Sequence, residues 1–282
     1  MKKPPKKTTS RAAKFDPDTV DQARNSDAGL APAADRALRI LETFERIGEP
    51  LTLSRLAEEI DAPISSCHNL VRTLSSRGYL FSLDSQRTFY PTRKLLDIAN
   101  SIFANDPVLQ QILPHAQSLR DATSETVIVA KRQEFSALYL LTLDSPQNIR
   151  YVSEPGRRIL LHSGATGKAL LSTLDDDELT KWLGSRRLEQ VTPKTITDHE
   201  KLRKDIRAGE ARGYFTNSGE NISDVSAIAV AFKLRREAFA IGVVGPTSRI
   251  HEERHAILRA LKETVAVIDG IARGKPGLRL RK

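Results

Sequence analysis

Residues 51–80, LTLSRLAEEIDAPISSCHNLVRTLSSRGYL, contain two amphipathic helical patterns separated by a short turn. The apolar residues of the first pattern share one helix face, and they are Leu53, Leu56, Ala57 and Ile60. Pro63 suits the turn or the first turn of the next helix, where its missing N–H is tolerated. The apolar stripe of the second pattern consists of Ile64, Cys67, Leu70, Val71 and Leu74. The stretch therefore predicts two short helices joined by a tight turn.

The flanking segments complete a small domain. Upstream, residues 35–48 predict a further helix that Gly48 ends. Its apolar stripe consists of Leu38, Ile40, Leu41, Phe44 and Ile47. Downstream, β-rich runs at 79–83 and 88–90 surround four turn residues, which is typical of a β-hairpin. Three helices followed by a hairpin predict a winged helix-turn-helix domain over residues 33–92.

One face of the third predicted helix is polar. Ser65, Asn69 and Arg72 recur at i, i+4 and i+7, and this face is flanked by Ser66, His68 and Thr73. Asparagine reads adenine and arginine reads guanine through paired hydrogen bonds in the major groove. Charge agrees, because residues 31–62 carry −3 and residues 63–93 carry +3. A solvated helix face has a similar pattern, but the surrounding helices and hairpin favour DNA reading.

The net charge of +9 is concentrated in the two tails of the chain. Residues 1–15 carry +6 and residues 273–282 carry +5, so residues 16–272 carry −2. Basic arms suit polyanions such as nucleic acid, although solubilising ends would have the same composition. Residues 1–32 lack apolar periodicity, and we predict a disordered basic arm there and a basic tail at 273–282.

The remaining totals bound the class of protein. A chain of 282 residues has room for about two domains. One cysteine excludes an intrachain disulfide and fits a reducing compartment. The basic N-terminus lacks the apolar region of a secretory signal, and no apolar run approaches the roughly 18 residues of a membrane span. We therefore expect a cytoplasmic protein without a membrane partner.

Strands and helices alternate in the second half of the chain. Residues 93–106 predict a linker helix, and Pro114 should kink or bound the helix after it. Strand-like runs follow at 126–132, 135–144, 149–153, 226–233 and 238–245. A final helix is predicted at about 251–272, with helix-rich segments between the strands. This pattern predicts an α+β fold, with a sensor-type domain over residues 107–272.

Two short motifs raise enzymatic alternatives. His251-Glu252-Glu253-Arg254-His255 fits H-E-x-x-H, in which two histidines hold zinc and the glutamate acts as general base. A third ligand would be Glu263 or Asp269, and the motif lies at an exposed helix start, so we favour a chance match. The stretch SGATGKALL at 163–171 has the wrong spacing for a phosphate loop and lacks its metal-binding hydroxyl. We expect no cofactor, and a zinc hydrolase stays the alternative.

Six stretches between residues 34 and 270 together resemble the IclR family of bacterial transcription regulators. In chain order they are RALRILETF, LTLSRLAEEIDAPISSCHNLVRTLSSRGYL, RTFYPTRKLLDIA, LLHSGATGKALL, TPKTITDHEKLRKDIRAGEARGY and VVGPTSRI. The resemblance implies a winged helix-turn-helix domain, a linker helix and a C-terminal GAF-like α/β effector-binding domain. It also implies dimers or tetramers that bind operators near catabolic operons.

The resemblance carries over to individual positions. It places Ser65, Ser66, His68, Asn69 and Arg72 on the recognition helix and Arg87 on the wing. In the effector domain, the family's small-residue loop corresponds to Ala165 and Thr166. The chain departs from the family at four pocket positions. Asn217 replaces an aspartate, Ala227 replaces a cysteine, and Gly242 and Val244 replace serines that often hold an effector carboxylate.

These departures predict a less polar pocket, suited to a larger or aromatic acid rather than a small keto acid. We therefore expect a ligand-responsive, homodimeric or homotetrameric regulator that binds pseudo-palindromic operator DNA and has no enzymatic activity. A DNA-architectural protein without an effector is a third class, and it would bind DNA without sequence preference.

Overall fold

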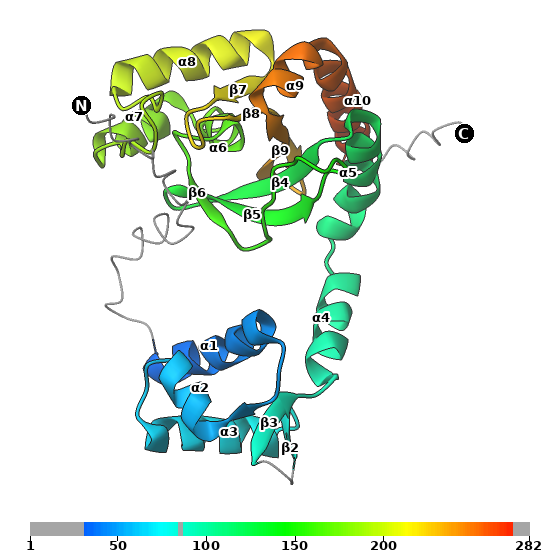
Figure 1. The fold of residues 1–282 in the computed structure, drawn as a ribbon. Coiled ribbons are helices and arrows are strands. Elements are labelled where there is room, and N and C mark those ends of the chain that lie inside the picture. The colour runs from blue at the N-terminus through cyan, green and yellow to red at the C-terminus, as the bar shows by residue number, and fades with distance from the viewer. Residues whose placement is uncertain (1–30, 84–86, 273–282) are drawn as a thin grey trace, which may run out of the picture. The chain divides into compact units, whose positions relative to one another are not determined.

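The computed structural model describes residues 31–83 and 87–272, and the chain divides into two compact units after Ser101 (Figure 1). The predicted basic arm lies almost wholly outside the described residues, and the predicted basic tail and hairpin turn residues 84–86 lie wholly outside them. The first helix begins at Pro32, inside the segment predicted as an arm. Proline is well accommodated there because the first helical turn needs no N–H donor at that position.

The N-terminal unit is a three-helix domain with a small antiparallel sheet. Its elements are α1 (Pro32–Ile47), β1 (Leu51–Thr52), α2 (Leu53–Glu59), α3 (Ile64–Ser76), β2 (Leu80–Leu83) and β3 (Thr88–Pro91). The strand order is β1-β3-β2, so the predicted hairpin is confirmed and gains a third strand. Two residues are too short for a periodic signal, which is why β1 was not predicted. Helix α4 (Lys94–Ala104) occupies most of the predicted linker segment.

The core of this unit lies between the three helices and the sheet. Its most buried side chains are Ile40, Phe44, Leu56, Ile60, Cys67, Val71 and Leu80. Two residues that the apolar pattern placed in the core are instead exposed, Leu38 at 60% and Ile64 at 57%. Leu38 precedes the buried Ile40 by two residues, which is about 200° around a helix. Ile64 is the first residue of α3 and lies beyond the edge of the core.

The C-terminal unit is built on a six-stranded antiparallel sheet in the order β6-β5-β4-β9-β8-β7. The strands are β4 (Thr126–Gln133), β5 (Ser136–Leu143), β6 (Arg158–Leu160), β7 (Phe215–Ser218), β8 (Val225–Leu234) and β9 (Glu237–Pro246). The helices are α5 (Leu109–Thr123), α6 (Ala165–Leu171), α7 (Asp176–Gly184), α8 (His199–Arg212), α9 (Thr247–Glu252) and α10 (Arg254–Ala272).

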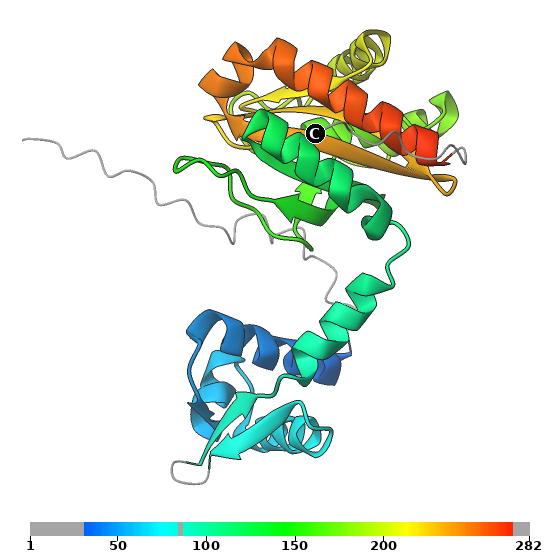
Figure 2. The ribbon, with the colours of Figure 1, turned by 90° about the vertical axis from the view of Figure 1, so that its right-hand side faces the viewer.

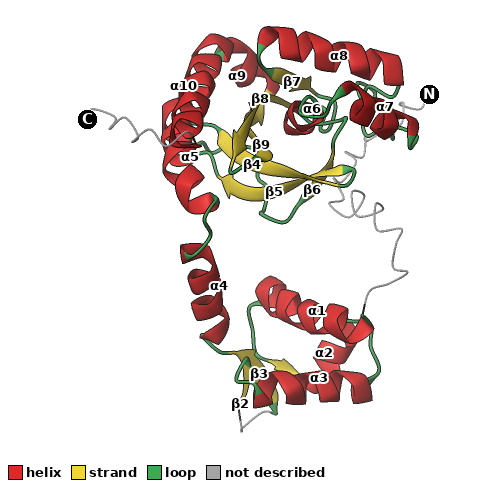
Figure 3. Ribbon diagram, turned by 180° about the vertical axis from the view of Figure 1, so that it is seen from behind, coloured by secondary structure: helices red, strands yellow, loops and turns green. Residues whose placement is uncertain are grey.

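Side chains that alternate along each strand serve two separate cores. On β4, Val127 and Val129 pack with α5 and α10, whereas Ile128 and Ala130 pack with α6, α7 and α8. Figure 2 shows α5 and α10 side by side across one face of the sheet, and Figure 3 shows the same layers by element type. Of the helices in the described segments, none is long and apolar enough to cross a bilayer.

Three predictions for this unit differ from the structure, and two of its strands were missed. Residues 149–153 are not a strand, and the buried Tyr151 carbonyl accepts a hydrogen bond from the Thr126 side-chain hydroxyl at 2.6 Å rather than from a backbone N–H of a sheet ladder. The short strands β6 and β7 were not predicted. Helix α5 continues through Pro114, so this proline bounds no helix. The final predicted helix is two helices, α9 and α10, which are separated at Glu253.

The β8–β9 turn allows a first stability prediction. Leu234 pairs with Glu237, so Arg235 and Arg236 form a two-residue turn, and their φ angles are 51° and 70°. Such turns strongly favour Asn-Gly, because most side chains disfavour a positive φ. We expect Arg235→Asn with Arg236→Gly to raise the free energy of unfolding by about 1–2 kcal/mol in urea titrations. Glutamine at both positions removes the charges but keeps the strain. An equal gain in that control would assign the effect to charge.

Candidate functional site

Helix α3 presents the predicted reading residues on one exposed face. Ser65, His68, Asn69 and Arg72 are exposed, while Cys67 and Val71 on the opposite face are buried. Ser66 is half-buried, because it lies about 100° around the helix from Ser65. Helix α3 thus positions five of the predicted side chains. Its buried face fixes the rotation of the helix about its own axis.

The ion pairs of the N-terminal unit leave its basic half available. Arg46 donates to Glu59 at 2.5 Å, and Arg55 lies 2.6 Å from the same carboxylate. The hydrogen bond from Arg46 lowers the pKa of Glu59, and Arg55 lowers it further. In contrast, no carboxylate among residues 31–83 and 87–272 pairs with Arg72 or Arg87. Residues 31–62 therefore keep a net negative charge, whereas α3 and the position just before β3 carry Arg72 and Arg87, which pair with no described carboxylate.

Arg87 lies at the predicted wing position. It directly precedes β3, is exposed, and has a φ of 51°. Arg87 comes immediately before Thr88, which pairs with Leu83 at the end of the β2–β3 ladder. An exposed arginine at the end of a hairpin ladder can reach a phosphate or a groove edge beside the one that a recognition helix occupies.

A small cavity in the C-terminal unit gathers most of the predicted effector residues. Five of the six line it, namely Ala165, Thr166, Asn217, Ala227 and Val244. Gly242 does not line it. A Cβ at Gly242 would lie 3.0 Å from the Thr166 methyl group, so glycine there lets the sheet approach α6 closely.

The cavity is small, and five of the eleven residues that line it carry a polar but uncharged side chain. Its volume is about 20 Å³, which is room for about one water molecule. Its two amides make internal hydrogen bonds, Asn217 accepting from the Glu220 N–H at 2.8 Å and Asn221 from the Ser163 hydroxyl at 3.3 Å. Of the described residues that line it, none is charged. An organic acid would have to open this space and would meet mainly apolar and neutral polar groups.

Two tyrosines of the cavity were not predicted from the sequence. Tyr139 and Tyr151 are both buried there, and the Tyr151 hydroxyl makes no hydrogen bond of ordinary geometry with the described residues. Burial, followed by the proximity of Tyr151, raises the pKa of Tyr139 well above its usual value. Tyr139 therefore keeps its phenolic proton at neutral pH, and each phenol can donate to a carboxylate. The run IRYVS at 149–153 was predicted as a strand, and that prediction did not indicate that Tyr151 lines the cavity.

A buried lysine connects the cavity to two other elements. Lys168 on α6 is 1% exposed, and its Nζ lies 2.7 Å from Asp205 Oδ2 and 2.8 Å from Glu220 Oε1. Asp205 belongs to α8, and Glu220 follows β7 beside the cavity residue Asn217. Burial raises the pKa of Glu220, and Lys168 acts in the opposite direction. The lysine of the GATGK stretch thus makes a structural ion-pair network.

The residues of the H-E-x-x-H match, which the sequence favours as a chance match, form no three-ligand site among the described residues. His251 lies in α9 and contacts Ser218 Oγ at 3.4 Å, whereas His255 lies in α10, after the break at Glu253. Among the residues that the structure describes, no group of three or more His, Cys, Asp or Glu side chains could hold a metal ion. Neither Glu263 nor Asp269 therefore completes a site with the two histidines.

Comparisons with known proteins agree with this architecture. The family model described as Bacterial transcriptional regulator IclR C-terminal matches residues 101–270, and the IclR helix-turn-helix domain matches residues 33–82. The chain is similar to the HTH-type transcriptional regulator BhcR of Paracoccus denitrificans, with 30% identity over 244 residues, 84% of this chain and 87% of that protein.

Solved structures share the fold. The Thermotoga maritima IclR structure aligns with a TM-score of 0.73 and 22% identity, covering 86% of this chain and 97% of that one. An IclR homolog from Microbacterium hydrocarbonoxydans, complexed with 4-hydroxybenzoate, aligns with a TM-score of 0.63 and 22% identity, covering 83% and 99%. A helix-turn-helix unit, an effector-type sheet domain and family matches over both units lead to one assignment. The chain belongs to the IclR family of bacterial transcription regulators.

Proposed function

We propose that this DNA-binding transcription regulator recognises a pseudo-palindromic operator of a catabolic operon as a homo-oligomer, and that a small organic acid controls its affinity. The exposed face of α3 carries the proposal. Arg72 and Asn69 lie on one solvent-facing side of a helix whose other side is locked into the core. A recognition helix in this arrangement inserts into the major groove and reads guanine and adenine edges.

Exposed apolar side chains of α4 support the homo-oligomer. None of its residues is buried, and its apolar side chains Leu96 and Ile102 are 53% and 68% exposed. An amphipathic helix normally covers its apolar stripe. A second copy of the chain would cover it symmetrically and set two recognition helices on two half-sites. The same exposed side chains serve a dimer or a tetramer of such dimers.

The cavity of the C-terminal unit is our proposed effector site. Ala227 and Val244 line the cavity where the family resemblance implies a thiol and a hydroxyl, and the remaining side-chain donors are the Thr166 hydroxyl, two amides and the two phenols. The homolog solved with 4-hydroxybenzoate supports an aromatic acid as the kind of ligand. Ligand binding would enlarge this small cavity and favour the protein conformation that has the larger cavity. If that conformation binds the operator with a different affinity, the ligand changes operator affinity.

We therefore expect calorimetry to detect binding of benzoate or 4-hydroxybenzoate, and none of glyoxylate or pyruvate at the same concentrations. The reason is that a small keto acid needs several polar donors, whereas an aromatic ring gains from the apolar wall. Tyr151→Phe keeps the ring but removes the unpartnered hydroxyl, and we expect aromatic acid binding to weaken about 10-fold or more. Tight binding of glyoxylate or pyruvate would contradict the proposed ligand class.

Selection of bound sites from a random duplex library at physiological salt tests the proposed function. We expect an enriched inverted repeat, because two recognition helices read two half-sites. Binding that follows salt concentration alone, without an enriched sequence, would instead identify a DNA-architectural protein. Operator affinity should then change when the acid identified by calorimetry is added. Such a change would show that effector binding in the C-terminal unit controls DNA binding by the N-terminal unit.

A further inference from the structure

We infer that Ile64 reads a thymine, by placing its side chain against the 5-methyl group in the operator's major groove. The inference rests on the proposed function and names a specificity-determining residue within it. Ile64 is the first residue of α3, and it is more than half exposed although the sequence pattern assigns it to the core. Its side chain is therefore available to a partner outside the folded unit.

The position of Ile64 matches the part of a recognition helix that contacts bases. The N-terminal residues of such a helix face the base edges. Ile64 lies one helical turn before His68, so the two side chains are neighbours at the edge of the reading face. Polar side chains with hydrogen-bonding groups make up the rest of that face. Within α3, which the structure describes completely, Ile64 is the exposed aliphatic residue.

The chemistry of the major groove selects the partner. Each base pair there displays donors and acceptors, and thymine alone among the four bases adds an apolar group, its 5-methyl. An exposed isoleucine gains by removing that methyl and itself from water, whereas it gains nothing from a phosphate. Ile64 therefore complements Asn69 and Arg72, whose groups suit adenine and guanine.

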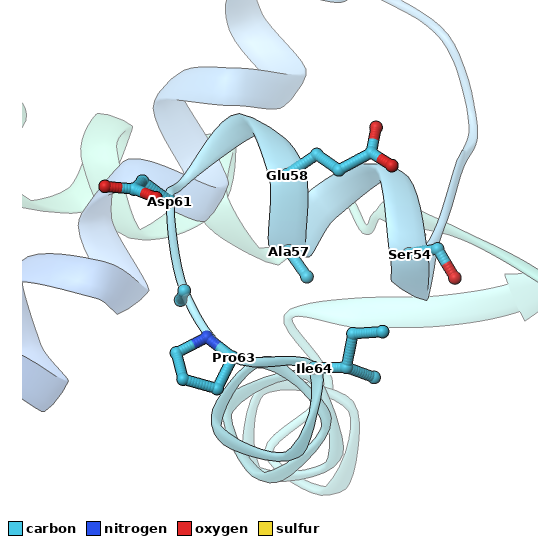
Figure 4. Close-up of a pocket in the computed structure, with 7 residues that line it drawn as sticks. Ser54, Ala57, Glu58, Asp61, Pro63 and Ile64 are labelled. Atoms are coloured by element: carbon cyan, nitrogen blue, oxygen red, sulfur yellow. The ribbon is translucent and has the colours of Figure 1, made fainter.

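The surroundings of Ile64 argue against a backbone contact. Its side chain lies at the rim of a shallow depression between α2 and α3, which Ala57 and Pro63 also line (Figure 4). Glu58 and Asp61 also line this depression. Their carboxylates disfavour a phosphate there, which leaves a base edge as the DNA group that Ile64 would contact.

Uracil scanning of the selected operator tests the inference with the full-length protein. Each thymine of the half-site is replaced in turn by deoxyuridine, which removes the methyl and keeps every hydrogen-bonding group. We expect one thymine per half-site at which the wild-type affinity falls about fourfold. In Ile64→Ala, the same substitution should change affinity less than about 1.5-fold, because the partner of the methyl is gone. Ile64→Val, which keeps an apolar contact, should retain most of the methyl effect.

Several outcomes would overturn the inference. If an inverted repeat is enriched but no uracil substitution weakens binding, the proposed function stands and only the role of Ile64 fails. The same holds if the uracil effect is equal in Ile64→Ala and the wild type. A changed oligomeric state of Ile64→Ala in sedimentation would show that a second copy covers this side chain. If no sequence is enriched, the proposed function fails and this inference fails with it.

Discussion

Replacing Lys168 by methionine lowers the free energy of unfolding by about 3–5 kcal/mol. The ammonium group is buried against two carboxylates, Asp205 at 2.7 Å and Glu220 at 2.8 Å, and it also donates to the Thr216 carbonyl at 3.2 Å. Methionine fills a similar volume but leaves these acceptors without a cation. Removing one partner of a buried network costs far more than an exposed ion pair contributes, because the remaining charges, above all that of Glu220, are only partly solvated.

Urea unfolding followed by tryptophan fluorescence measures this effect directly. The chain's one tryptophan, Trp182, is buried in the same core as α6, so its emission reports on the C-terminal unit. Lys181→Met is the matched control, because Lys181 is exposed on α7, and we expect it to change stability by less than about 0.5 kcal/mol. A midpoint for Lys168→Met equal to that of the control would show that the network contributes no stability.

The pH dependence gives this prediction a second readout. Without Lys168, burial and Asp205 both raise the pKa of Glu220 above its value in the unfolded chain. The folded variant then binds a proton more tightly than the unfolded variant, so its stability is greatest at low pH and falls as pH rises. We expect the loss relative to the wild type to be larger at about pH 8 than at about pH 5. Lys168→Met with Glu220→Gln should recover part of the loss and flatten its pH dependence.

Local sequence patterns predicted most of the N-terminal unit, but not β1, which pairs with the distant strand β3. Helices α2 and α3, the turn at Pro63 and the β2–β3 hairpin each involve residues close in sequence, and all four features were predicted. The errors lie at the ends of apolar stripes. Periodicity identifies the face of a helix, but it does not show where along the helix the core ends. Leu38 and Ile64 illustrate this, and Ile64 became informative only once its exposure was known.

The cavity and its surroundings could be predicted only in part. The family resemblance indicated Ala165, Thr166, Asn217, Ala227 and Val244, and the fold brings these five around one space. Nothing in the sequence linked Lys168 to Glu220, which is 52 residues away, because their pairing depends on the packing of α6 beneath the loop after β7. Tyr151 was missed for a similar reason. Its buried position follows from a backbone contact with Thr126, 25 residues earlier.

Arg72→Ala weakens operator binding by about 1–3 kcal/mol, or roughly 5- to 150-fold. The side chain is exposed on the reading face, and no carboxylate in the described ranges competes for its guanidinium. The proposed bidentate contact to guanine would therefore form without breaking an ion pair within the described ranges. Because Val71 on the other face holds α3 in the core, truncating Arg72 should leave the domain folded.

Fluorescence anisotropy with the selected operator and with a scrambled duplex, at one salt concentration, separates base reading from phosphate contact. Arg72→Ala should weaken binding to the operator much more than to the scrambled duplex. Arg77→Ala is the matched control, because Arg77 is also exposed but follows the C-terminal end of α3, and any loss should be equal on both duplexes. Equal losses for Arg72→Ala would make it a phosphate contact. Unchanged affinity would remove Arg72 from the reading face and leave Asn69 as the main base contact of α3.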